Sequence, residues 1–256
     1  MNPIARIGKV LEETIYRLVA TRRGSPSATR DAMSASREAW REISRGKWAN
    51  AITWGKLAIA SDPSHPDGYL MLGFAYAQSG QPEEGRRAYE EGVLVAPRDA
   101  RLAGYLGELE LDQHHWARAE SAYRRAVELD PSQLSWRANL AHAVRMQDRF
   151  DEAAALLEAL LEVAPHHAKA LLSLGEVRSQ SGDFLEAEDL MRSAIAADPT
   201  LAAAHYHLAW LLMDMERWDE ALREAERALE LNPGDTPSIE LLARAEASVR
   251  EHGRIG

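Results

Sequence analysis

The sequence predicts an all-α protein built from six tandem helix pairs, and three observations support this fold class. The first is a proline that returns every 34 residues, at Pro63, Pro97, Pro131, Pro165, Pro199 and Pro233. The second is that two fixed positions within this interval hold a small residue in every copy. The third is the absence of any alternating apolar and polar pattern that would indicate strands. A period of this length is typical of stacked repeat architectures.

The N-terminal segment, residues 1–24, has the pattern of an amphipathic helix. Its apolar residues recur at helical spacing and charged residues interrupt every run, so the segment fits neither a membrane span nor a secretion signal. Two readings stay open: a helix that docks on its own chain, or one that binds a partner or a membrane surface peripherally. Glycine, proline and serine in residues 24–30 predict a linker, so residues 1–31 precede the repeats.

The repeats cover residues 32–235 when the recurrent proline is placed at motif position 32. The six units are 32–65, 66–99, 100–133, 134–167, 168–201 and 202–235. Position 8 holds Ala39, Gly73, Gly107, Ala141, Gly175 and Ala209, and position 20 holds Ala51, Gly85, Ala119, Ala153, Ala187 and Ala221. Small residues let two helix backbones approach closely, and large apolar residues at positions 7 and 24 fill the space beside them. Each unit is therefore expected to be a pair of antiparallel helices.

Glycine and proline mark the expected helix ends. Gly80 and Gly182 are placed where the first helix of a unit would end in a left-handed residue. The proline at position 32 ends the second helix, because it lacks an amide proton and disfavours helical geometry in the preceding residue. Beyond Pro233, residues 236–256 have apolar residues on one face, which predicts a capping helix and a tail.

This phased pattern resembles the tetratricopeptide repeat family, and residues 72–97 match it best. The resemblance implies a right-handed superhelical solenoid of six helix pairs, with an N-terminal helix and a C-terminal capping helix. Repeat 1 departs from the pattern at Glu38 and Gly55, and we expect Trp40, Trp48 and Trp54 to fill the space left there. A narrower likeness is to the magnetosome-associated scaffolds of the family, which also combine an N-terminal helix, a degenerate first repeat and a short array. This likeness suggests a bacterial source.

Composition excludes several classes of function. A chain of 256 residues with 46% hydrophobic residues can bury a sizeable core, whereas a net charge of −10 disfavours binding to nucleic acid. The absence of cysteine fits a reducing compartment, so the expected location is cytoplasmic. No histidine pair has the i, i+4 spacing of a metal site, and no glycine-rich phosphate loop or GxSxG turn is present. We therefore expect neither catalysis nor a cofactor.

Charge runs on the second helices, such as PEEGRRAYEEG, mix signs at i, i+3 and i+4. This predicts a solvated outer face with local ion pairs. The family places its first helices along the concave face, so a ligand would meet side chains at motif positions 2, 5, 6, 9, 12 and 13. The resulting candidates for partner contact are Trp40, Leu70, Met71, Phe74, Tyr105, Asn139, His142, Glu176, Tyr206, His207 and Trp210.

For Leu70 and Tyr206, a role in the core between repeats is as well supported as a role in the groove. The carboxylate clamp of chaperone-binding family members is not expected, because Glu108 and Ser173 occupy positions where that clamp needs asparagine and arginine.

The expected function is a non-enzymatic scaffold or adaptor that binds a peptide or helix of a partner protein in the concave groove. Two alternatives stay open. In the first, the chain is a structural protein that assembles into homo-oligomers, with one end docked in a neighbour's groove. In the second, the chain is the binding subunit of an enzyme system whose catalysis lies on another chain.

Overall fold

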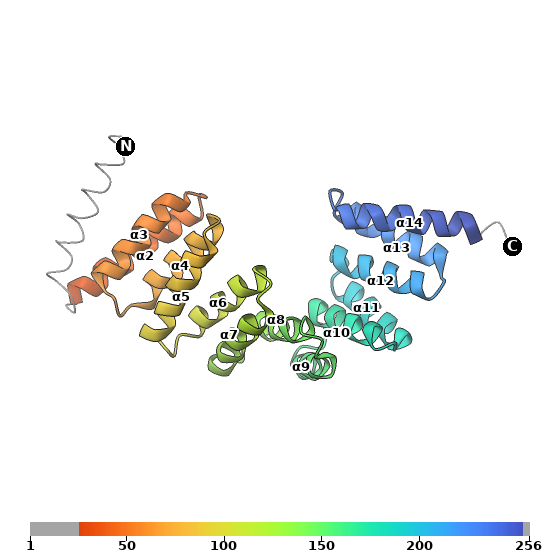
Figure 1. Cartoon of the computed structure of the whole chain (residues 1–256), viewed down its shortest axis with the longest axis horizontal. Helices are drawn as coiled ribbons and strands as arrows, with labels where there is room; N and C mark the ends of the chain where they lie inside the picture. The colour runs from red at the N-terminus through yellow and green to blue at the C-terminus, as the bar shows by residue number, and fades with distance from the viewer. Residues whose placement is uncertain (1–25, 253–256) are drawn as a thin grey trace. The chain divides into compact units, whose positions relative to one another are not determined.

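The computed structural model describes residues 26–252, which form 13 α-helices and no strand (Figure 1). The all-α fold class is confirmed. The amphipathic helix expected over residues 1–24 lies outside the described residues, as does the tail at 253–256. None of the described helices is both long and apolar enough to cross a lipid bilayer.

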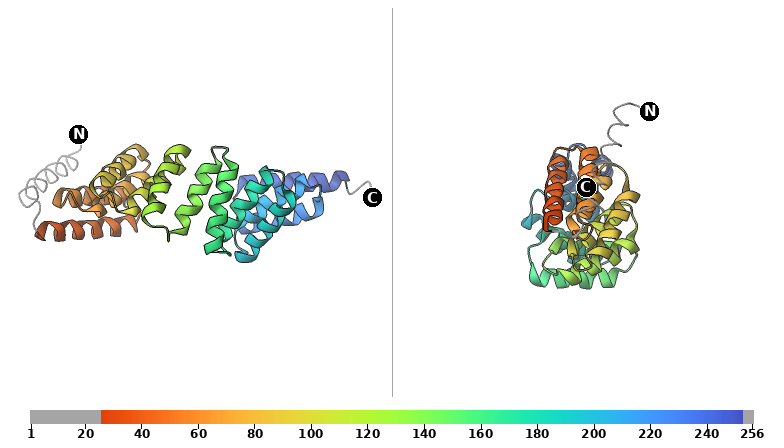
Figure 2. Two further views of the ribbon diagram at one scale, coloured as in Figure 1. Left: turned by 90° about the horizontal axis from the view of Figure 1, so that it is seen from below. Right: turned by 90° about the vertical axis from the view of Figure 1, so that its left-hand side faces the viewer.

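The chain divides into two compact units, and the described part of the first runs to Trp136. Its helices are α2 (Pro26–Ile43), α3 (Trp48–Ser61), α4 (Pro66–Gln78), α5 (Pro82–Val95), α6 (Ala100–Asp112) and α7 (Trp116–Leu129). They pack in successive pairs, α2 with α3, α4 with α5 and α6 with α7 (Figure 2). The first helices of neighbouring pairs also contact each other, α2 with α4 and α4 with α6, so they form one continuous layer.

The second unit begins at Arg137, within α8 (Leu134–Arg145). It continues with α9 (Phe150–Val163), α10 (Ala168–Gln180), α11 (Phe184–Ala197), α12 (Ala202–Asp214), α13 (Trp218–Leu231) and α14 (Thr236–His252). The last helix packs against α12 and α13 and buries Leu241 and Ala245. Its apolar face therefore covers the final helix pair.

The first helices begin at regular intervals, and three of them begin after a capping side chain. From α4 onward the first helices begin at residues 66, 100, 134, 168 and 202, each 34 residues after the last. The side chains of His65, Asp99 and His167 each accept a hydrogen bond from a backbone N–H in the first turn of the helix that follows. Such caps satisfy donors that have no partner inside the helix.

In repeats 2 and 3 the glycine at motif position 8 lies directly under the tyrosine ring at position 24. A Cβ atom added to Gly73 would lie 2.5 Å from the Tyr89 ring, and one added to Gly107 would lie 2.8 Å from the Tyr123 ring. Both tyrosines are buried. Since carbon atoms in contact need about 3.5 to 4.0 Å, these positions exclude any side chain while the ring stays in place.

The turn inside each helix pair contains one residue in the left-handed region. Gly80 has φ of +78° and Gly182 has φ of +86°, as the sequence predicts. The same position in three other pairs is held by His114, Asp148 and Glu216, with φ of +58°, +60° and +59°. Residues with a Cβ atom adopt this region at an energetic cost, so these turns are strained relative to the glycine turns.

Two expectations for the first repeat are wrong. Residues 26–30 are not a linker, because α2 begins at Pro26 and its first turn buries Ala28; proline is well tolerated at a helix start. Trp40 does not fill the space beside Gly55, since its side chain is 52% exposed. That space is closed instead by the backbone of Leu72, which a Cβ atom on Gly55 would approach to 3.1 Å.

The charged second helices are not wholly solvated, contrary to expectation. Arg86 on α5 bonds locally to Glu83, and its Nε also donates to the carboxylate of Glu110 on α6 at 2.5 Å. Glu110 is only 2% exposed and also contacts His115 at 2.8 Å. Such an ion pair connects one helix pair to the next, so these charges contribute to packing between repeats.

Candidate functional site

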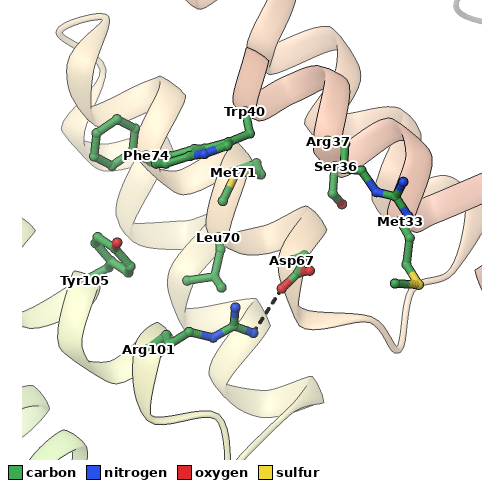
Figure 3. Close-up of a pocket in the computed structure, with 10 residues that line it drawn as sticks. All are labelled: Met33, Ser36, Arg37, Trp40, Asp67, Leu70, Met71, Phe74, Arg101 and Tyr105. Atoms are coloured by element: carbon green, nitrogen blue, oxygen red, sulfur yellow. Dashed lines mark hydrogen bonds and ion pairs between the residues drawn. The ribbon is translucent and has the colours of Figure 1, made fainter. Parts of the chain in front are cut away.

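A pocket of about 370 Å³ opens on the layer of first helices in the first unit (Figure 3). Its walls come from α2, α4 and α6, and its lining residues are Met33, Ser36, Arg37, Trp40, Asp67, Leu70, Met71, Phe74, Arg101 and Tyr105. Five of them are among the residues predicted from the sequence to contact a partner: Trp40, Leu70, Met71, Phe74 and Tyr105. The structure therefore brings these five together in one place.

Aromatic rings from three helices form a row along one side of the pocket. The Trp40 and Phe74 ring centroids lie 6.2 Å apart in an edge-to-face arrangement, and Phe74 and Tyr105 repeat this distance and geometry. Tyr105 also stacks on the buried ring of Tyr89, at 6.2 Å. Edge-to-face and offset-stacked contacts are favoured between aromatic rings, so the row is fixed to the core through Tyr89.

The floor and the rim of the pocket differ in exposure. Leu70 is 2% exposed and belongs to the core formed with Tyr69 and Leu102, so its main role is packing. Met33 and Trp40 lie at the rim and are 41% and 52% exposed. Large apolar side chains at the mouth of a pocket are available for contact with a ligand.

Polar side chains occupy the other end of the pocket. The Arg101 guanidinium bonds to Asp67 at 2.9 Å and to Asp99 at 2.6 Å, and these carboxylates, Asp99 foremost, raise its pKa above the ordinary value. Arg37 is exposed, and within residues 26–252 it forms no ion pair. Ser36 is 6% exposed, and its hydroxyl has no hydrogen-bond partner among the described residues.

Five of the lining residues are not among the candidates predicted from the sequence: Met33, Ser36, Arg37, Asp67 and Arg101. Met33, Asp67 and Arg101 occupy motif position 2, and the two others occupy positions 5 and 6. Motif positions 2, 5 and 6 were among those expected to face a ligand, so the repeat register already predicted a location in the groove for these five residues. The set of candidate residues was smaller than the register allowed.

The other six predicted residues all lie in the second unit, where Glu176 on α10 is the centre of a charged cluster. Its carboxylate contacts Arg145 of α8 at 3.0 Å and Nε2 of His207 on α12 at 3.0 Å. Arg145 also approaches Nδ1 of His142 at 3.2 Å. Burial, reinforced by the Arg145 charge, lowers the pKa of His142. Burial also lowers the pKa of His207, against the opposing effect of Glu176.

Aromatic side chains follow this cluster along α12. Tyr206 meets Trp210 edge to face at 6.5 Å, and the guanidinium of Arg244 on α14 lies 4.8 Å above the Trp210 ring. Both rings are half-buried and pack on the core of this unit, so Tyr206 has a part in the core as well as an exposed edge. Asn139 on α8 is likewise half-buried.

The arrangement suits recognition by shape and charge. Over residues 26–252, no group of three or more His, Asp or Glu side chains is placed to hold a metal ion. The chemistry that the pocket of the first unit offers is an apolar wall of rings with charged groups of both signs at one end.

Comparison with protein families identifies the repeats. Two models described as tetratricopeptide repeat match the chain, one at residues 70–134 and 138–202 and the other at residues 178–245. Together they cover more than half of the chain. Protein FlbA of Caulobacter vibrioides is 26% identical over 187 residues, which is 73% of this chain and 31% of FlbA. The chain spans about a third or less of the length of the curated relatives it matches.

Solved structures show the same fold. The structure of pilF from Pseudomonas aeruginosa matches with a TM-score of 0.70 at 17% identity, over 85% of this chain and 99% of that chain. YrrB, described as a TPR protein with an unusual peptide-binding site, matches with a TM-score of 0.56 at 15% identity. That match covers 73% of this chain and 96% of YrrB. Because the sequence identities are this low, these two matches show similarity of the fold only.

Proposed function

The chain belongs to the tetratricopeptide repeat family, a fold typical of protein-interaction scaffolds, and we propose on this premise that it is a non-enzymatic scaffold. Its ligand is a peptide segment or helix of a partner protein. The site is the pocket between α2, α4 and α6, which presents an apolar wall to a side chain of the partner.

The observation that carries this proposal is the exposure of Trp40 and Met33 at the mouth of a pocket with an aromatic and apolar wall. Tryptophan is prominent among the residues that dominate binding at protein interfaces. Concave pockets lined by aromatic and apolar groups, with a few polar groups, are also the usual form of ligand sites.

Fixed geometry of the rings supports the same proposal. Trp40, Phe74 and Tyr105 contact one another and the buried ring of Tyr89 before any ligand arrives. A preorganised site loses less side-chain entropy on binding, which raises affinity for a given contact area. The peptide-binding site named for YrrB makes a similar activity reasonable for this chain.

The test uses a phage-displayed library of random peptides, selected on the full chain and then measured as free peptides by calorimetry. Trp40→Ala and Phe74→Ala should each weaken binding of the selected peptides about tenfold or more, since buried aromatic anchors dominate association. The far-ultraviolet circular dichroism of Trp40→Ala should match the parent chain, because that ring is half exposed.

The matched control is Glu90→Lys, which changes an exposed charge on the second helix α5. This variant should bind like the parent chain, because single exposed charges contribute little. If selected peptides lose affinity with Glu90→Lys and keep it with both aromatic variants, the ligand binds the second-helix surface and the proposed site is wrong. If no peptide is enriched on the parent chain, peptide binding itself is refuted.

A further inference from the structure

Motif position 9 forms a row across the first helices of the first unit, and this row ends in a carboxylate. The residues at this position are Trp40 on α2, Phe74 on α4 and Glu108 on α6. The three helices contact one another in that order, and the Trp40 and Phe74 ring centroids lie 6.2 Å apart. Tyr105, one turn before Glu108 on α6, makes the next ring contact with Phe74. Since equivalent positions of stacked repeats are neighbours, Glu108 continues the aromatic row beyond the pocket.

The Glu108 carboxylate is half-buried and unpaired. Within residues 26–252 it forms no ion pair or hydrogen bond, and neither does Asp112, one turn further along α6. Burial, reinforced by the charge of Asp112, raises the pKa of Glu108. Burial also raises the pKa of Tyr89, and the charge of Glu108 adds to that effect. Because charges away from water are normally paired, an unpaired carboxylate beside these rings costs free energy in the chain without a ligand.

Glu108 and Asp112 also determine the sign of the charge on this surface. At the polar end of the pocket the charges cancel, because the two arginines, Arg37 and Arg101, are matched by the two aspartates that bond to Arg101. No cation among the described residues pairs with Glu108 or Asp112 in the same way. A ligand that complements the first-helix surface at this point therefore carries a positive charge.

From these features we propose that the first unit selects a segment of a partner protein in which an arginine or lysine lies close to a large apolar side chain. This inference rests on the proposed function and names the ligand's chemistry. The apolar side chain enters the pocket, and the apolar stem of the basic residue lies along Phe74 and Tyr105. Its charged head bonds to Glu108, and Asp112 adds to the attraction. Hydrogen bonds between a cation and a carboxylate are stronger than those between neutral groups.

The test compares short fluorescein-labelled peptides that contain one tryptophan, one variable residue and otherwise Gly, Ala and Ser. The variable residue is placed in turn at each of the four positions on either side of the tryptophan, and it is arginine, citrulline or glutamate. Citrulline has nearly the shape of arginine without its charge. Fluorescence anisotropy with the full chain should show the best arginine peptide binding about fivefold tighter than its citrulline counterpart, the upper end for an exposed ion pair. The glutamate counterpart should bind more weakly than both.

Variants of three carboxylates make the result specific. Glu108→Gln should remove the preference for arginine over citrulline, and Asp112→Asn should reduce it in part. The Tm of Glu108→Gln without peptide should not fall, because the change removes a half-buried charge that has no partner. Lost discrimination with retained stability distinguishes a ligand contact from a structural role. The matched control is Glu90→Gln, which removes one exposed carboxylate from α5 and should keep the full preference.

Several results would overturn the inference. Equal binding of the arginine and citrulline peptides, or a preference that survives Glu108→Gln, would show that Glu108 does not recognise a cation. A lower Tm for Glu108→Gln would assign this carboxylate to the fold instead. Met33→p-benzoylphenylalanine, irradiated without peptide, should give no crosslink to residues 1–25 or to a second copy, and either crosslink would identify a different occupant. If phage-selected peptides depend on Phe74 but are not enriched in basic residues, this inference fails while the proposed function stands.

Discussion

Replacing Glu216 with glycine should stabilise the second unit. Glu216 lies in the turn between α12 and α13 with φ of +59°, and its exposed side chain forms no ion pair within the described residues. The equivalent turn between α10 and α11 uses Gly182 with φ of +86°. A Cβ atom on Gly182 would have nothing within 4 Å, so the turn itself offers open space. The cost at Glu216 therefore comes from the backbone conformation alone.

The magnitude follows from two opposing contributions. An L-residue other than glycine in the left-handed region costs roughly 1 to 2 kcal/mol. Replacement by glycine removes this cost but itself destabilises the folded state by about 0.5 to 1 kcal/mol, because glycine has more conformational freedom in the unfolded chain. Glu216→Gly should thus raise the free energy of unfolding by about 0.5 to 1 kcal/mol. Asp148→Gly should gain less, since aspartate adopts this conformation more readily.

Urea denaturation followed by circular dichroism measures the change, with amide hydrogen exchange in α12 and α13 as a local readout. The matched control is Gly182→Glu, which should lower the free energy of unfolding by a similar amount. The reasoning is refuted if Glu216→Gly leaves stability unchanged or lowers it while Gly182→Glu has no effect. That result would mean that the turns relax without cost.

Three other changes test separate features. Gly107→Leu should cost about 1 to 3 kcal/mol through overpacking against Tyr123, and faster amide exchange should appear first in α6 and α7. Arg86→Leu should cost about 3 kcal/mol in urea titrations at neutral pH, because it leaves the Glu110 carboxylate buried with only His115 beside it. For His142, whose pKa is lowered in the folded chain, the unfolded state takes up its proton first as the pH falls below about 6.5. Stability should therefore decline from there toward the folded-state pKa, and His142→Gln should flatten this part of the stability curve.

Much of the fold could be read from the sequence because the repeat period constrains every copy at once. Six prolines and two series of small residues predict helix pairs, and the structure contains helix pairs with the same spacing. The strained turns could not be predicted, because only glycine gives a signal for left-handed geometry. His114, Asp148 and Glu216 take that geometry because the flanking helices impose it.

The candidate site could be predicted only in part. Motif register placed Trp40 and Phe74 at position 9 and Tyr105 at position 6, and both positions were expected to lie on the same face of the first helices. Register does not reveal which side chains pair with each other, so the ion pairs of Arg101 with Asp67 and Asp99 could not be predicted. Burial of Leu70 was also left open, because it depends on how closely α4 and α6 approach.

The packing of Gly107 under the Tyr123 ring has a consequence for how such repeats change over time. In other repeats the same two positions hold Ala141 with Leu157 and Gly175 with Met191, so a methyl group at position 8 occurs opposite leucine but not opposite a tyrosine ring. Moving from glycine and tyrosine to alanine and leucine one step at a time passes through either a clash or a cavity. Both intermediates are less stable than either end, so selection should favour changes that come together. Motif positions 8 and 24 should therefore change together. A repeat that receives its first helix from another repeat should keep its stability only if position 24 of its second helix fits the new residue at position 8.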